Sequence, residues 1–181
     1  MEVTPTALPE VLVLRPRIFR DDRGAFWETW NDRTIAEAGL PGEWRQDNTS
    51  ISKRNVVRGI HYQIQQPQGK LVRAIAGRIL DIAVDLRRSS PRFGKHVAVE
   101  LSGDDSGMLW IPAGFGHAFV ALTEEARVSY KVTDYYSPAG ERTILWNDPA
   151  IGIDWPVSAG EAILSPKDAA GKPLAEAEAF A

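Results

Sequence analysis

The chain has 181 residues, with 44% hydrophobic and 25% charged residues, and its 21 Lys and Arg against 24 Asp and Glu give a net charge of −3. This composition is typical of one globular domain, expected to span residues 1–181, and the weak negative charge argues against a nucleic-acid partner. The absence of cysteine excludes a disulfide framework, a thiolate zinc site, an iron–sulfur cluster and a cysteine nucleophile.

The N-terminal segment lacks the basic-then-apolar order of a signal peptide, and its apolar run covers only Val11 to Leu14. No segment approaches the roughly 20 apolar residues of a membrane span. We therefore expect a soluble, cytoplasmic protein with no membrane partner.

One short helix and then many short strands are predicted in chain order. Asn31 and Asp32 begin the helix and Gly39 ends it, because these residue types are favoured at helix caps. A further helical turn or two is expected at 169–180. Alternating apolar residues and short apolar runs between turns then predict strands at 56–63, 71–76, 80–86, 96–101, 108–111, 117–123, 128–133 and 143–146.

The alternation within these strands indicates which faces are buried. Leu80, Ile82 and Val84 alternate with Asp81 and Asp85, which predicts a strand buried on one face only. Many short strands and almost no helix predict an all-β fold, best a jelly-roll (cupin-like) β-sandwich or barrel with a few short helices. Because such barrels bind ligands in the mouth or lumen, the chemistry is expected on inward-facing residues.

Only three histidines could supply imidazole chemistry. His61 has polar and cationic neighbours, so a catalytic and a structural role are both open. His117 ends the pattern Pro-x-Gly-x-x-His at 112–117, in which a tight turn delivers the imidazole to the next strand. His96 lies opposite its strand's apolar face and is expected to be exposed. A cupin metal site also needs an HxH pair and a Glu, which the segment 61–63 lacks, so no metal is expected.

Tyr130 shares a strand face with Val128 and Val132 and should point into the barrel. It could be a core residue, or its hydroxyl could form an acid–base pair with a histidine across the lumen. Arg58 and Lys70 flank His61 in the sequence and, with Arg23, could hold a diphosphate. Each cation alone could equally be a solvated surface charge.

Several segments, in order between about residues 10 and 170, together resemble the dTDP-4-dehydrorhamnose 3,5-epimerase family of cupin-type jelly rolls. They are Phe19-Arg20-Asp21-Asp22-Arg23-Gly24-Ala25-Phe26-Trp27-Glu28, Gln46-Asp47-Asn48-Thr49-Ser50, Arg58-Gly59-Ile60-His61-Tyr62-Gln63, 112–119, Tyr130-Lys131, 134–138, 146–149 and Leu164-Ser165-Pro166-Lys167-Asp168. Two departures from the family pattern are Thr49, where the family often has histidine, and the shortened spacing between His61 and Lys70.

The resemblance implies epimerisation at C3 and C5 of a dTDP-4-keto-6-deoxyhexose. By this likeness His61 is the base, Asp168 orients it, Tyr130 is the acid on the other face, and Lys70 stabilises the enolate. Arg58 and His117 would line the same cavity. The positions that hold the nucleotide diphosphate and sugar are Arg23, Glu28, Gln46, Asp47, Asn48, Glu141 and Lys167. The first two reach the ligand from a neighbouring subunit, which implies a homodimer, and no metal or organic cofactor is needed.

The odd separation of Arg58 and His61 would place them on opposite faces of a regular strand. Both can line the lumen only if the strand bulges, and Gly59 is the expected place. Three alternatives stay open: an epimerase acting at C3 or C5 only, a metal-dependent cupin enzyme, and a non-catalytic sugar- or nucleotide-binding barrel.

Overall fold

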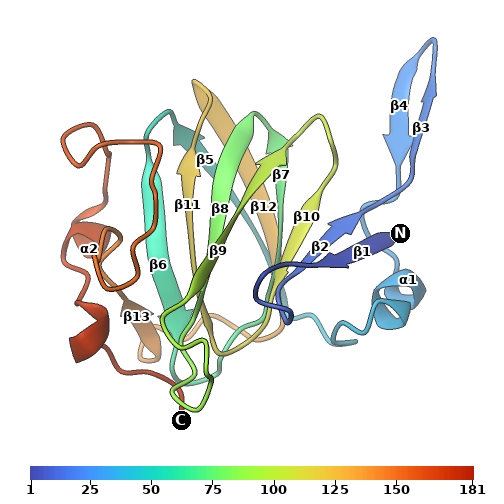
Figure 1. The fold of residues 1–181 in the computed structure, drawn as a ribbon. Coiled ribbons are helices and arrows are strands. Elements are labelled where there is room, and N and C mark those ends of the chain that lie inside the picture. Colours follow the sequence, from blue (N-terminus) through green and yellow to red (C-terminus); the bar gives the residue numbers. More distant parts are fainter.

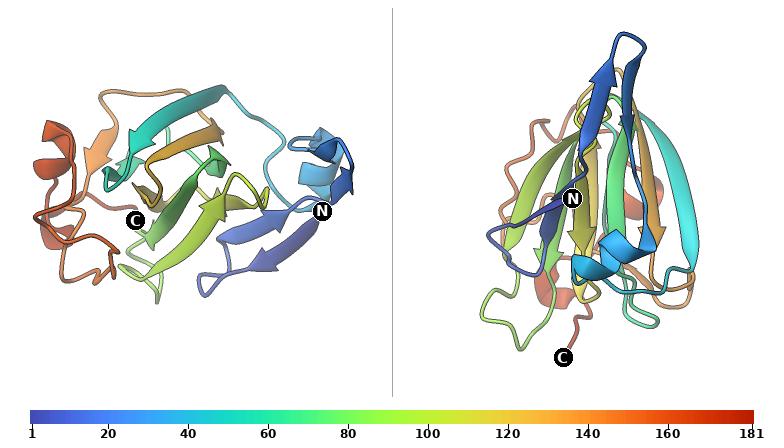
Figure 2. Two further views of the ribbon diagram at one scale, coloured as in Figure 1. Left: turned by 90° about the horizontal axis from the view of Figure 1, so that it is seen from above. Right: turned by 90° about the vertical axis from the view of Figure 1, so that its right-hand side faces the viewer.

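A computed structural model describes residues 1–181 and shows two antiparallel sheets packed face to face (Figures 1 and 2). The six-stranded sheet has the order β1 (Glu2–Pro5), β2 (Leu12–Arg15), β10 (Met108–Ile111), β7 (Lys70–Ala76), β12 (Glu125–Val132) and β5 (Gln46–Lys53). The five-stranded sheet has the order β13 (Glu141–Thr143), β6 (Val57–Gln63), β11 (Phe115–Ala121), β8 (Arg78–Asp85) and β9 (His96–Ser102). The predicted all-β sandwich of jelly-roll type is confirmed.

The main core lies between the two sheets, where apolar side chains of both inner faces meet. A second core lies on the outer face of the five-stranded sheet, under the C-terminal segment that follows β13. Figures 1 and 2 show this segment, in orange and red, on the side away from the N-terminus. Strand β8 is covered on both faces: Ile82 and Val84 lie under this segment, while Asp81 and Asp85 share the inner face with Ile79 and Ala83 and are fully buried. The prediction that this strand is buried on one face only is wrong.

The helices are short, as expected. Helix α1 (Asp32–Glu37) begins where the side chain of Asn31 accepts hydrogen bonds from the N–H groups of Arg33 and Thr34, and Gly39 follows it with φ +77°. The tail holds a single 3₁₀ turn, η1 (Leu174–Glu176), while α2 (Pro166–Ala169) lies outside the predicted elements. No helix is long and apolar enough to cross a membrane.

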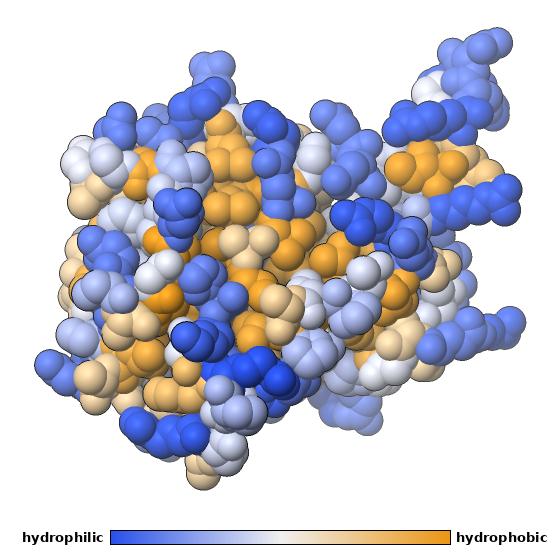
Figure 3. Space-filling view, viewed as in Figure 1, coloured by the Kyte–Doolittle hydropathy of each residue, from blue (hydrophilic) through white to orange (hydrophobic).

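A separate hairpin of β3 (Ile18–Asp21) and β4 (Gly24–Trp27) projects from the sandwich beside the N-terminus (Figure 1). It carries the exposed side chains of Phe19 and Phe26, the latter 72% exposed. In the space-filling view, hydrophobic side chains in orange lie on this hairpin between charged ones (Figure 3). These aromatic rings pack against nothing within the protomer's core.

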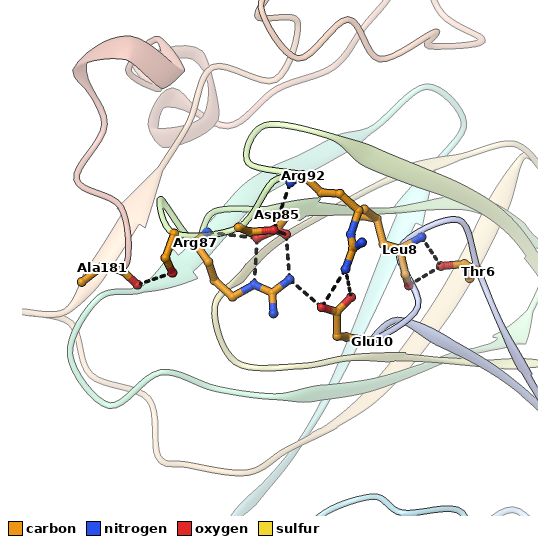
Figure 4. A network of polar contacts seen from close by, with 9 residues as sticks. Thr6, Leu8, Glu10, Asp85, Arg87, Arg92 and Ala181 are labelled. Atoms are coloured by element: carbon orange, nitrogen blue, oxygen red, sulfur yellow. Dashed lines mark hydrogen bonds and ion pairs between the residues drawn. The ribbon is translucent and has the colours of Figure 1, made fainter.

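A polar network joins the N-terminal segment to the turn between β8 and β9 (Figure 4). The guanidinium of Arg87 donates to both oxygens of the buried Asp85, at 2.9 and 2.7 Å, and to Glu10 at 3.0 Å. Arg92 donates to the same Glu10 carboxylate. The network therefore anchors the chain before β2 to the five-stranded sheet.

Candidate functional site

A cavity of about 350 Å³ opens between the sheets and holds nine of the predicted site residues. They come from β5, β6, β7, β11, β12, β13 and α2, and they are Gln46, Asn48, Arg58, His61, Lys70, His117, Tyr130, Glu141 and Lys167. Residues as far apart in the chain as Gln46 and Lys167 thus share one concave site, which is the usual form of a small-molecule site.

The predicted bulge at Gly59 brings Arg58 and His61 to the same face. In the pairing of β6 with β11, His61 lies opposite His117 but Arg58 lies opposite Phe119, so β6 holds one extra residue. Gly59 has φ +123°, and a Cβ at this position would lie 2.4 Å from the Cβ of Ala118. Only glycine fits this conformation and this close approach.

His61 and Asp168 form a hydrogen-bonded dyad at one wall of the cavity. The Nε2 atom of His61 lies 2.5 Å from Oδ1 of Asp168, and Asp168 is 3% exposed. Helix α2 presents this carboxylate, which also accepts from the Gly59 N–H and the Ser165 hydroxyl. Since Nε2–H donates to Asp168, the lone pair of the imidazole is on Nδ1.

The protonation states of the dyad follow from its surroundings. Burial lowers the pKa of His61, as do Lys167 and Lys70, and these effects exceed the opposing effect of Asp168. Burial alone would raise the pKa of Asp168, but hydrogen bonds from His61, Ser165 and Gly59 bring it below the ordinary value. At neutral pH the site therefore holds a neutral imidazole beside a carboxylate, the form that can accept a proton.

Tyr130 faces the cavity from the other sheet, and its ring centroid lies 6.4 Å from that of His117. Burial raises the pKa of Tyr130, although the charges of Arg58 and Lys167 oppose the effect. Its hydroxyl thus stays protonated at neutral pH and can serve as a proton donor.

Lys70 is a nearly buried cation between the two sheets. Burial lowers the pKa of Lys70 to about 8, while the charges of Asp81 and Glu141 work in the opposite direction. Its Nζ lies 3.5 Å from the carbonyl oxygen of His61. An ammonium group held here, with little water around it, can stabilise negative charge that develops on a bound ligand.

A second histidine–carboxylate pair lies deeper in the same cavity. His117 Nε2 is 2.7 Å from Oδ1 of Asp81, and the two side chains are 8% and 0% exposed. The other oxygen of Asp81 has no hydrogen-bond partner in the protein. The sequence does not point to Asp81 as a site residue, because alternation along its strand predicts that it is exposed.

A ring of polar side chains surrounds the cavity mouth. Lys167 donates to Glu141 at 2.7 Å, and the hydroxyl of Tyr136 donates to the other oxygen of Glu141 at 3.1 Å. Gln46 accepts from the N–H of Tyr136 and donates to Asn48. These bonds hold the loop that carries Tyr136 across the mouth.

Six lining residues were not predicted, namely Ser50, Tyr62, Gln63, Gln68, Phe119 and Tyr136. Three of them lie two positions after a residue that was predicted, so strand alternation could have found Ser50 from Asn48, Gln63 from His61 and Phe119 from His117. Nothing comparable points to Gln68 or Tyr136, which lie on loops.

Four predicted or considered residues lie elsewhere. The Asp47 side chain is on the opposite face of β5 from Gln46 and Asn48, where it accepts from Lys131 at 2.9 Å, so it does not line this cavity and its role in nucleotide binding stays a prediction. Arg23 pairs with Asp21 on the hairpin and is 89% exposed, and Glu28 follows that hairpin. Neither lines the cavity of its own protomer. His96 begins β9 and is half-buried instead of exposed.

No group of three or more His, Cys, Asp or Glu side chains is arranged to hold a metal ion. The histidines at the cavity are each bound to a single aspartate.

Comparison with known proteins gives consistent matches over nearly the whole chain. A sequence model described as dTDP-4-dehydrorhamnose 3,5-epimerase matches residues 5–176. The chain is 51% identical to the dTDP-4-dehydrorhamnose 3,5-epimerase of Pseudomonas aeruginosa, covering 99% of both chains, and 51% identical to that of Salmonella typhimurium, covering 98% of this chain and 97% of the relative. A crystal structure of dTDP-6-deoxy-D-glucose-3,5-epimerase from Legionella pneumophila, in complex with dTDP-4-keto-L-rhamnose, has a TM-score of 0.93 at 44% identity and covers 98% of this chain and 94% of that one.

Proposed function

The chain belongs to the dTDP-4-dehydrorhamnose 3,5-epimerase family, and from this premise we propose that its cavity inverts C3 and C5 of a dTDP-4-keto-6-deoxyhexose for rhamnose synthesis. The observation that carries the proposal is the meeting of a neutral His61–Asp168 dyad, a protonated Tyr130 and the buried Lys70 in one cavity. These are a base, an acid and a cation, which are the groups that such a reaction requires.

The 4-ketone acidifies the C–H bonds on the two adjacent carbons. His61 takes the proton, the C–H electron pair moves to form the enolate, and negative charge develops on the ketone oxygen. Tyr130 then gives its phenolic proton to the opposite face of the carbon and the ketone reforms. Before the next abstraction His61 releases its proton to solvent and the Tyr130 phenolate takes one from solvent. The product has the same atoms and oxidation state as the substrate, so the step needs no electron acceptor.

The remaining polar groups of the cavity are suited to stabilise the enolate and to hold the diphosphate and sugar. Lys70 supplies positive charge for the enolate oxygen, while Arg58 and His117 line the same cavity. Gln46, Asn48, Glu141 and Lys167 would hold the diphosphate and sugar, because ammonium and amide groups donate to phosphate oxygens and the Glu141 carboxylate can accept from sugar hydroxyls.

Arg23 and Glu28 would act on the ligand of a neighbouring subunit in a homodimer. The hairpin that carries Arg23 projects from the sandwich (Figure 1), and Arg23 does not line the cavity of its own protomer. Phe19 and Phe26 on this hairpin are exposed, as expected of a segment that packs against another copy. The cytoplasmic location and the single domain stay predictions from the sequence.

The deciding experiment is incorporation of solvent deuterium into a dTDP-4-keto-6-deoxy sugar, followed by NMR. We expect exchange at both C3 and C5, no exchange with His61→Ala, and exchange without correct reprotonation for Tyr130→Phe. Exchange at one carbon only would show a mono-epimerase. No exchange at all with such sugars would favour the non-catalytic binding barrel, and a fully active His61→Ala variant would exclude the mechanism.

A mixing experiment tests the shared site. Arg23→Ala and His61→Ala chains are each expected to be poorly active at low substrate concentration. Mixed dimers regain one complete site, because His61 of one chain meets Arg23 of the other. About a quarter of the wild-type activity should return on random reassortment, since half of the dimers are mixed and each has one complete site. Activity that does not recover, in dimers shown to have exchanged subunits, would mean that Arg23 does not act across the interface.

A further inference from the structure

Ser165 contacts the Asp168 carboxylate on the side away from His61. Its hydroxyl donates to Oδ2 of Asp168 at 2.6 Å and accepts from the Asp168 N–H at 3.1 Å. The second of these bonds makes Ser165 the N-cap of α2. One hydroxyl therefore both begins the helix and binds the carboxylate that the helix presents to His61.

The hydrogen bonds of Asp168 divide between its two oxygens. Oδ1 takes the His61 contact at 2.5 Å and the Gly59 N–H at 3.3 Å. Oδ2 takes the Ser165 hydroxyl alone. Without that donor, nothing would hold Oδ2, and the carboxylate could turn about its terminal torsion, which is intrinsically broad.

We propose that Ser165 is a positioning residue of the epimerisation site, which fixes the rotation of the Asp168 carboxylate and draws its charge toward Oδ2, and so sets the orientation and basicity of His61. The inference rests on the proposed function for the role of His61 as the base. It extends the dyad to a hydrogen-bonded chain of three residues, Ser165, Asp168 and His61, in which Ser165 itself lies outside the cavity.

The sign of the effect follows from the charge distribution. A carboxylate that loses the Ser165 donor is a stronger acceptor toward His61, so removal of the hydroxyl should raise the pKa of His61. The other charged groups that face His61 are Lys167 of α2, Lys70 of β7 and Glu141 of β13. Lys70 and Glu141 belong to other elements, whereas Lys167 lies on the helix that Ser165 caps. A His61 shift therefore reports the Asp168 link where the variant keeps the cap.

Three variants separate helix capping from hydrogen-bond donation. Ser165→Ala removes both functions. Ser165→Gly removes the donor but keeps most of the capping preference, since glycine is also favoured at helix N-caps. Ser165→Thr keeps both functions and is the conservative control. Thermal unfolding of each variant shows whether the fold survives.

The readouts are the NMR titration of His61 and the deuterium exchange rate of the substrate sugar. The chain has three histidines, so the His61 signal is identified by its loss in His61→Gln. We expect Ser165→Ala and Ser165→Gly to raise the pKa of His61 and to lower kcat on the order of ten-fold with little change in KM, through loss of alignment. Ser165→Thr should restore both.

Two results would overturn the proposal. One is an unchanged His61 titration in both donor-less variants. The other is a loss confined to Ser165→Ala, with Ser165→Gly behaving as wild type, which would leave Ser165 as a helix cap only. If the His61 titration shifts as expected in the Ser165 variants but the wild-type protein exchanges no deuterium, the link from Ser165 to His61 is supported and the proposed function is refuted.

Discussion

Replacing Asp168 with asparagine should remove the charge of the dyad and keep its shape. The amide oxygen can still accept from His61 Nε2, and the amide nitrogen can take the place of Oδ2 beside the Ser165 hydroxyl. Asp168 is 3% exposed, so water can do little to compensate for the lost charge. The substitution therefore isolates the electrostatic contribution of the carboxylate to the base.

The expected size follows from hydrogen-bond energies. A bond to a charged group contributes roughly 1.5–3 kcal/mol, against roughly 0.5–1.5 kcal/mol for a neutral pair. The difference of about 1.5 kcal/mol stabilises the imidazolium that forms when His61 takes the proton, and it corresponds to about a ten-fold loss of kcat. The pKa of His61 should fall, which is opposite in sign to the shift expected for Ser165→Ala.

The assay is the deuterium exchange rate at saturating substrate, with the His61 titration measured on the same protein. Asp154→Asn, on an exposed residue, is the matched control and should behave as wild type. Folding lowers the pKa of Asp168 below its value in the unfolded chain. The ionised carboxylate therefore stabilises the fold at every pH above the unfolded-state pKa, and this contribution is lost only as pH falls through the lowered pKa. Rates at neutral pH are thus free of that effect. Wild-type kcat with an unchanged His61 titration would refute the reasoning.

Three further substitutions test the buried ion pair of Asp85, the ammonium group of Lys70 and the bulge at Gly59. Arg87→Ala leaves the buried Asp85 unpaired and should cost about 3 kcal/mol of unfolding free energy, whereas Arg78→Ala, in an exposed ion pair, should cost less than about 1 kcal/mol; equal losses in urea unfolding would contradict this. If the ammonium of Lys70 is needed, activity should fall as pH rises through about 8, and Lys70→Gln should lose that limb of the kcat profile together with most of its activity. Gly59→Ala should unfold at lower temperature and bind substrate poorly because its Cβ has no room; a native Tm with full activity would argue against the tight bulge.

The sequence predicted best those strands that alternate over a covered and an open face. The strand at 96–101 has this form, and β9 follows it closely. The same signal fails for β5, because Gln46 and Asn48 are polar inward-facing residues of the cavity while Asp47 faces outward. A strand that builds a polar site does not show apolar alternation. The polar residues Gln46 and Asn48 thus mark the site in the sequence and, for the same reason, hide the strand that carries them.

The burial of Asp81 could not be read from its own segment. The apolar face of its strand, with Ile82 and Val84, lies under the chain that follows β13, more than 60 positions later in the sequence, so that Asp81 is on the inner face beside His117. The bulge at Gly59 could be predicted from the sequence. Arg58 and His61 are three positions apart, so a regular strand would place them on opposite faces, and Gly59 lies between them where the strand can bulge. Local pattern can thus reveal a conflict within one strand, but not which distant segment covers it.

Under the proposed function the two histidines at the cavity have different roles, and their environments, not their residue type, separate those roles. His61 and His117 lie directly opposite each other on neighbouring strands, and each binds one aspartate through Nε2. His61 is 25% exposed toward the cavity and its aspartate comes from a separate helix, so its Nδ1 can meet a substrate carbon. His117 is 8% exposed and its aspartate belongs to the adjacent strand of the same sheet, so the rigid pair forms the wall against which a sugar can be held. A base must be accessible to the substrate and must have a partner that can adjust its pKa. Of the two pairs, His61 with Asp168 meets both conditions.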